Sequence, residues 1–186
     1  MEKKVLIMTF EMNSQAYEAF SKLKELHLQQ RIVVEQMAIV NHDEAHSFQV
    51  KDFLDMTGND KLITGGLIGM LVGILGGPLG MLLGWTTGSI IGGTGDASEV
   101  KDALSAFEKT SDAISQGKTG LIVIASEYAE EVIDQLVHGE LNGEVIRLHE
   151  QSVREEVEAA RQAEKELRKE ARKKWFNEKF RKKSTN

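Results

Sequence analysis

The sequence LITGGLIGMLVGILGGPLGMLLGWTTGSIIGGTG occupies residues 62–95 and contains no charged side chain. Glycine recurs in it at a spacing of four, in two series that meet at a Gly-Gly-Pro turn: Gly65, Gly69, Gly73 and Gly77, then Gly80, Gly84, Gly88 and Gly92. A spacing of four residues puts each series on one face of an α-helix. The stretch therefore predicts two short apolar helices joined by a turn, which we call the glycine hairpin.

Glycine inside a helix costs about 1 kcal/mol relative to alanine, so these arms need close contact with another helix, as in GxxxG pairs. We therefore take the eight glycines as helix-packing residues. The arms, residues 64–75 and 79–92, contain 12 and 14 residues. A membrane span takes roughly 20 apolar residues. The glycine hairpin therefore spans a thinned bilayer, enters a bilayer partway, or packs into the core of a soluble oligomer.

Composition indicates one compact domain with appendages, in a chain of 186 residues that has no cysteine and a formal net charge of −6. Residues 1–150 carry 11 basic and 22 acidic residues, whereas residues 151–186 carry 12 basic and 7 acidic ones. The acidic body argues against nucleic acid as a partner. The N-terminus lacks the apolar core of a signal peptide, so we expect the chain in the cytoplasm or at the cytoplasmic face of a membrane.

The patterns on both sides of the glycine hairpin predict two strand–helix–strand units. Apolar runs predict strands at residues 5–10, 32–40, 47–51, 121–125 and 144–148. Apolar stripes predict helices at residues 14–28, 98–116 and 126–138. Asn13 or Ser14 can cap the first helix, and we expect Tyr17 and Tyr128 to face inward. The order predicts an α+β fold, with a ferredoxin-like sandwich in domain 1–150 that residues 62–95 interrupt.

Residues 151–186 are predicted to form one long charged helix. Its first part, residues 153–166, mixes both signs, and we expect it to be solvated. Residues 167–183 hold nine basic and two acidic residues. Basic helices with aromatic side chains suit an anionic membrane surface, and the candidate contacts here are Arg172, Lys173, Lys174, Trp175, Phe176, Lys179 and Phe180. Two alternatives are packing of this helix on the body or a second copy, and binding of nucleic acid.

The segment 65–93, with GGPLG at residues 76–80, and the elements on both sides of it resemble a bacterial family known as domain of unknown function 1269. The resemblance covers about residues 3–149 and includes the GKTGLIVI strand at 117–124 and the segment 143–147. Members of that family are described as predicted membrane proteins or stress-associated proteins. The resemblance implies the fold given above and a membrane or stress-related role, and it implies no catalytic residues.

Two short motifs suggest chemistry, but neither matches a functional site. His42 and His46 are four residues apart, yet they lack the HExxH order and lie in a predicted turn. The GKT at residues 117–119 resembles the end of a phosphate loop, but position 112 is aspartate and the segment precedes a strand. No serine–histidine or paired-carboxylate set can be assembled. We therefore expect no enzyme activity, no metal site and no cofactor.

These observations give one leading hypothesis and two alternatives. We expect a non-enzymatic, oligomeric, membrane-associated protein of the cytoplasmic face, with its own copies and anionic lipid as partners. The glycine hairpin would mediate helix packing or bilayer insertion. The first alternative is a soluble protein that assembles through its glycine hairpins, and the second is a sensor that binds a small ligand on the sheet.

Overall fold

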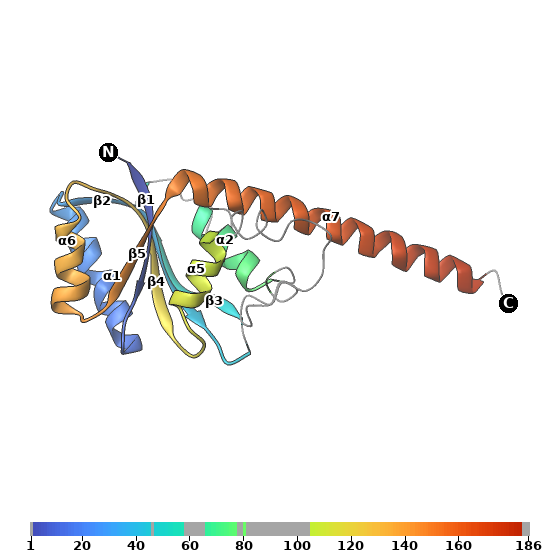
Figure 1. The fold of residues 1–186 in the computed structure, drawn as a ribbon, viewed down its shortest axis with the longest axis horizontal. Helices are drawn as coiled ribbons and strands as arrows, with labels where there is room; N and C mark the ends of the chain where they lie inside the picture. The colour runs from blue at the N-terminus through green and yellow to red at the C-terminus, as the bar shows by residue number, and fades with distance from the viewer. Residues whose placement is uncertain (1, 46, 58–65, 78–79, 81–104, 184–186) are drawn as a thin grey trace.

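The computed structural model describes residues 2–45, 47–57, 66–77, 80 and 105–183. It has a mixed α+β fold, as predicted, and ends in a long helix (Figure 1). In chain order, the elements are β1 (Lys3–Thr9), α1 (Asn13–Leu28), β2 (Ile32–His42), β3 (Phe48–Asp55), α2 (Leu67–Leu75), α5 (Ser105–Ala113), β4 (Thr119–Glu127), α6 (Glu131–Asp134), the π-helix η1 (Gln135–Glu140), β5 (Glu144–His149) and α7 (Glu150–Lys183).

The five strands form one sheet in the order β3-β2-β4-β1-β5, in which every neighbouring pair is antiparallel. Each predicted strand is present, and β3 continues four residues past the predicted end at residue 51. Most of the second arm of the glycine hairpin and the start of the helix predicted at 98–116 lie outside the described residues. The described part of that helix, α5, ends at Ala113 rather than near residue 116.

Helices cover both faces of the sheet (Figure 1). On one face, α1, α6 and η1 share a core with Leu6 and Met8 of β1. On the other face, α2, α5 and the first part of α7 share a core with Val5 and Ile7 of the same strand. Since successive side chains of a strand point to opposite faces, a strand covered on both sides is apolar throughout. This explains the unbroken apolar runs in β1 and β4.

The start of α1 differs from the prediction that Asn13 or Ser14 caps it. Met12 precedes the helix, and its backbone N–H donates to the side-chain oxygen of Gln15 at 2.8 Å. The Asn13 side chain instead accepts a hydrogen bond from the backbone N–H of Thr119 at 3.0 Å. Asn13 therefore ties the start of α1 to the start of β4, a contact between distant segments that competes with local capping.

Three predictions about solvent contact are wrong. Tyr17 and Tyr128 were expected inside, but they expose 47% and 63% of their surface. The inward positions of α1 are occupied by Ala16, Ala19 and Leu23, and a tyrosine beside such a stripe keeps its hydroxyl in water. The segment 153–166 was expected to be solvated, but three of its side chains are buried in the core, as described below.

Candidate functional site

The first arm of the glycine hairpin, α2, lies on the sheet as a buried helix. It contacts β2, β3 and β4, and α5 and α7 pack against it. Six of its nine residues expose 4% or less of their surface, namely Leu67, Ile68, Leu71, Val72, Ile74 and Leu75. A helix that is apolar on every side is typical of a buried position. In the described part of the chain, protein atoms therefore cover these six apolar side chains of the arm.

The glycines of α2 lie on its least buried side. Gly69 is half-buried and Gly73 is exposed, and a Cβ atom at Gly73 would meet no atom within 4 Å. At the end of the helix, a Cβ atom at Gly76 would lie 2.6 Å from the carbonyl oxygen of Phe48 in β3. Close backbone contact therefore requires glycine at the end of the arm. Of the predicted packing glycines, Gly65, Gly84, Gly88 and Gly92 lie outside the described residues.

The first part of α7 forms a second wall over α2. Val153, Val157 and Ala160 are 3% exposed or less and share the core that contains α2. The Glu156 carboxylate accepts a hydrogen bond from the backbone N–H of Ala106 at 2.8 Å, so α7 also holds the start of α5. Spacings of four and three residues put such side chains on one helix face. The signal was present in the sequence, but the mixed charges around it led to the wrong expectation of a solvated segment.

Past its contact with α2, α7 leaves the body and projects into solvent (Figure 1). A weak hydrogen bond from Arg161 to the sulfur of Met70 at 3.8 Å joins α7 to α2. Every side chain from residue 165 to residue 173 is exposed, and Leu167 exposes 44% of its surface. Over residues 165–173, polar and apolar side chains of α7 alike are therefore exposed to water.

The predicted lipid contacts lie on this projecting part. The side chains of Arg172 and Lys173 are exposed. Those of Lys174, Trp175, Phe176, Lys179 and Phe180 lie outside the described residues, although the helix itself continues to residue 183. The acidic residues nearer the body are engaged within the helix, because Arg168 pairs with Glu164 and Lys169 pairs with Glu166. Because residues 167–183 hold nine basic and two acidic residues, the net positive charge increases toward the far end of α7.

An ion cluster built around one buried carboxylate joins α6 to the sheet. The Glu127 side chain is only 2% exposed, and Arg147 of β5 binds it through Nε at 3.0 Å and Nη2 at 2.9 Å. Lys4 approaches Glu127 at 3.5 Å and also binds Glu130. The hydrogen bond to Glu127 raises the pKa of Arg147, and the hydrogen bond from Lys4 lowers the pKa of Glu130. Asp134 of α6 also lies 2.9 Å from the Arg147 guanidinium. Each of the two basic side chains therefore binds two or more acidic ones, which indicates a structural role.

The motif residues that suggested chemistry are used in packing. His42 is 3% exposed, its Nδ1 lies 2.7 Å from the carbonyl oxygen of Ile114, and its ring stacks on Phe48 at a centroid distance of 4.0 Å. His46 lies outside the described residues. The Lys118 ammonium donates to the carbonyl oxygen of Glu11 at 3.2 Å. Within the described ranges, no group of three or more acidic, histidine or cysteine side chains is placed to hold a metal ion.

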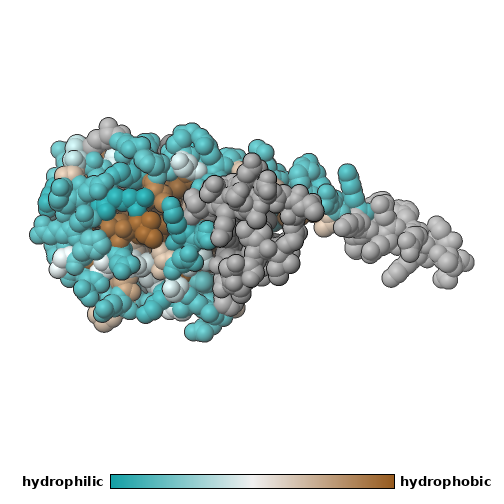
Figure 2. Space-filling view, in the orientation of Figure 1, coloured by the Kyte–Doolittle hydropathy of each residue, from teal (hydrophilic) through white to brown (hydrophobic). Residues whose placement is uncertain are grey.

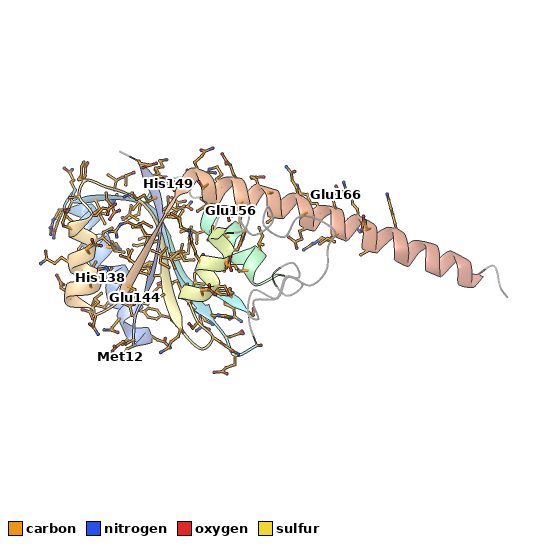
Figure 3. The ribbon with its side chains drawn as sticks, in the orientation of Figure 1. Met12, His138, Glu144, His149, Glu156 and Glu166 are labelled. Atoms are coloured by element: carbon orange, nitrogen blue, oxygen red, sulfur yellow. The ribbon has the colours of Figure 1, made fainter. Side chains whose placement is uncertain are left out.

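A hollow of about 810 Å³ opens where β1 ends and β5 begins. His138 and Glu144, which lie close to each other in Figure 3, are among the residues that line it. The His138 Nδ1 lies 2.7 Å from the carbonyl oxygen of Gly143, and Lys118, which also lines the hollow, is bonded to a backbone carbonyl. Of the residues that line the hollow, His138 and Lys118 therefore contact backbone carbonyl oxygens of the chain itself.

No family model, no curated protein and no solved structure matches this chain. The family resemblance therefore stays a prediction. None of the helices in the described ranges combines the length and the apolar character needed to cross a bilayer. The candidate site is thus defined by geometry: an apolar arm held between the sheet and α7, and a basic helix that projects from the body.

Proposed function

We propose that the chain is a non-enzymatic protein that binds the anionic cytoplasmic face of a membrane through the projecting part of α7. The observation that carries this proposal is the exposure of α7 beyond the body, together with nine basic and two acidic residues in 167–183. Near an anionic lipid surface, each basic residue contributes about 1 kcal/mol of attraction. Projection also keeps this charge away from the acidic body, which lipid headgroups would repel.

The same charge argues against pairing between the projecting helices of two copies. Like charges on facing helix surfaces repel, and residues 167–183 hold a large excess of basic side chains. An anionic surface instead neutralises them and receives the exposed Leu167 at its apolar boundary. A membrane surface therefore suits this helix better than a second copy of the same helix.

We also propose that the sheet is of the ferredoxin-like kind, with β3 as an added edge strand and the glycine hairpin inserted after it. Two features support this: the order β2-β4-β1-β5, and the placement of α1 and the α6–η1 segment on one face. The face that such a sandwich leaves open is covered here by α2, α5 and α7. The glycine hairpin would then serve as a helix-packing cover for that face.

The burial of α2 favours a second candidate function, a soluble protein that assembles through its glycine hairpins. The apolar side chains of α2 are already covered by protein, so this arm has no need of lipid. Both candidates are non-enzymatic, and they differ in whether the chain recognises a lipid surface. Vesicle binding therefore distinguishes them.

The test is co-sedimentation of the full chain with vesicles of phosphatidylcholine alone and with vesicles that also contain phosphatidylserine. We expect binding only to the anionic vesicles, and release at high salt because salt screens exposed charges. The variant Arg172→Gln/Lys173→Gln/Lys174→Gln removes three charges, so it should weaken binding by about 3 kcal/mol, or roughly 100-fold.

The matched control removes the same charge from the body. Lys24, Lys51 and Lys109 are exposed on α1, β3 and α5, and changing all three to glutamine should leave vesicle binding at the wild-type level. Equal loss of binding in both triple variants would show that net charge, and not α7, is responsible. Absence of binding to either vesicle, with self-association retained, would favour the soluble assembly.

A further inference from the structure

The two edges of the sheet differ in how well they are protected against pairing with another strand. The β3 edge pairs with β2 through an irregular register at Ile39 and Val40, and it presents Lys51, Asp52 and Asp55. Bulges and charged side chains are the usual means by which proteins block an edge strand. The β5 edge also carries charged residues, Glu144 and Arg147, but it pairs with β1 through six consecutive residues without irregularity. Among the described residues, no strand lies beyond β5.

The open edge of β5 also carries apolar surface. Val145 and Ile146 are half-buried although each packs against a core. Figure 2 shows a hydrophobic area where β5 runs, surrounded by hydrophilic surface. An edge strand presents unpaired N–H and C=O groups on its outer side, so this area combines apolar side chains with free backbone hydrogen-bonding groups.

The sequence of β5 is compatible with pairing to a copy of itself. A two-fold axis perpendicular to the sheet leaves each face of the sheet on the same side in both copies. The two β5 strands then run antiparallel, and the residue at the axis lies opposite the same residue of the second copy. An axis at Ile146 places Ile146 opposite Ile146, Val145 opposite Arg147, and Glu144 opposite Leu148. Like charges directly opposite each other would destabilise the pair, and this register contains no such pair.

The neighbouring register, with the axis at Arg147, is much less favourable. It places Arg147 opposite Arg147 of the second copy, and Glu144 opposite Glu150 of the second copy. In the register centred on Ile146, the Arg147 guanidinium is already bound to the buried Glu127 carboxylate, so it does not oppose approach of the second strand. Glu144 and His149 mark the two ends of the strand in Figure 3.

We propose that β5 joins two copies of this chain edge to edge, with Ile146 on the two-fold axis, so that the two five-stranded sheets become one continuous antiparallel sheet. The partner is a second copy of the chain, because the register and the charges of β5 complement β5 itself. This interface is separate from the projecting part of α7, so it is independent of the proposed membrane binding.

A cysteine placed on the axis tests the proposal directly, because the chain has no cysteine of its own. Cβ atoms of directly opposite residues lie about 4.5–5.5 Å apart in antiparallel pairs. In Ile146→Cys, mild oxidation without lipid should therefore convert most of the chain into a disulfide-linked dimer. Lys51→Cys, on the protected β3 edge, is the control and should remain monomeric on a non-reducing gel. Absence of cross-linking in Ile146→Cys, or equal cross-linking in both variants, overturns the proposal.

Light scattering gives a second, independent measurement. The wild-type chain should have a mass of about 41 kDa, twice the chain mass of 20.7 kDa. Ile146→Lys should halve this mass, with unchanged circular dichroism as the check on folding. A wild-type mass equal to one chain overturns the proposal, and so does an unchanged mass in a folded Ile146→Lys variant. If Ile146→Lys does not fold, the cysteine experiment decides, because it needs no disruption of the interface.

Discussion

Replacing Leu71 by alanine tests whether the first arm of the glycine hairpin is packed on the body in solution. Leu71 is 0% exposed and shares a core with the sheet, α5 and α7. Removing a buried leucine side chain loses its transfer free energy and leaves a cavity, which together cost about 2–5 kcal/mol. For a chain of this length, each kcal/mol corresponds to roughly 2–4 °C in Tm. Leu71→Ala should therefore lower Tm by about 10 °C.

A second variant in α2 serves as a control, because it should raise the stability of the chain rather than lower it. Gly73 is exposed, and a Cβ atom there would meet no atom within 4 Å. Alanine is favoured over glycine inside a helix by about 0.5–1 kcal/mol, because it loses less backbone entropy on folding. Gly73→Ala should therefore raise Tm slightly. Both variants keep α2 uncharged and apolar, so their difference reports on packing rather than on composition.

The assays are thermal unfolding, which gives Tm, and urea unfolding, both of the full chain without lipid or detergent and both followed by circular dichroism. We expect the midpoint to fall for Leu71→Ala and to rise for Gly73→Ala, with similar slopes for both. A free energy of unfolding for Leu71→Ala within about 0.5 kcal/mol of wild type, as for a surface site, would refute the packed position of α2. In that case the apolar arm would have to be covered by something other than its own sheet.

Other predictions concern the end of α2 and the ion cluster. Gly76→Ala should lower the free energy of unfolding by about 1–3 kcal/mol, measured in urea, because its Cβ would lie 2.6 Å from a backbone carbonyl oxygen of β3. Arg147→Ala leaves the 2%-exposed Glu127 without its main partner, so we expect a loss of about 3–5 kcal/mol in the same assay. The pKa of Glu130 is lowered, chiefly by its hydrogen bond from Lys4. Its stabilising contribution is therefore complete above the unfolded-state pKa of about 4.3 and is lost as pH falls through the folded-state pKa. Glu130→Gln should accordingly lose less stability than wild type as the pH falls from about 6 to below the unfolded-state pKa.

The sequence predicted the strands well because their signal is local. Unbroken apolar runs such as residues 121–125 identify strands buried on both faces, and β4 is buried along almost its whole length. The cover of the second face was harder to predict. Val157 and its neighbours on α7 sit among many charges, and only the folded chain shows that they pack over α2.

The ion cluster could not have been predicted from the sequence. Arg147 and Glu127 are 20 residues apart, and Lys4 lies at the other end of the domain in sequence. Antiparallel pairing of β1 with both β4 and β5 brings the three together. No local periodicity encodes such a meeting, because it depends on strand order and register. The same reason explains why Asn13 was wrongly expected to cap α1 rather than to bind Thr119.

The packed position of α2 limits what membrane binding can involve. A helix of nine residues is about 13.5 Å long and cannot cross a hydrocarbon core of about 30 Å. Because α2 is packed on the sheet, even partial insertion of this arm would require it to leave the sheet. That would uncover six buried apolar side chains, each worth about 1.5–3 kcal/mol of burial, together with the sheet face beneath them. Adsorption through the far end of α7 requires no such exposure.

Membrane binding and packing of α2 should therefore be energetically independent. Leu71 lies in the core, whereas Arg172 and Lys173 lie on the projecting part of α7, and distant sites with no shared partner have additive effects. Leu71→Ala should lower the urea midpoint without changing affinity for anionic vesicles. The Arg172/Lys173/Lys174 glutamine variant should weaken binding to anionic vesicles without changing the urea midpoint. If Leu71→Ala instead strengthens vesicle binding several-fold, the arm leaves the sheet to enter lipid, and adsorption through α7 alone is insufficient to explain the function.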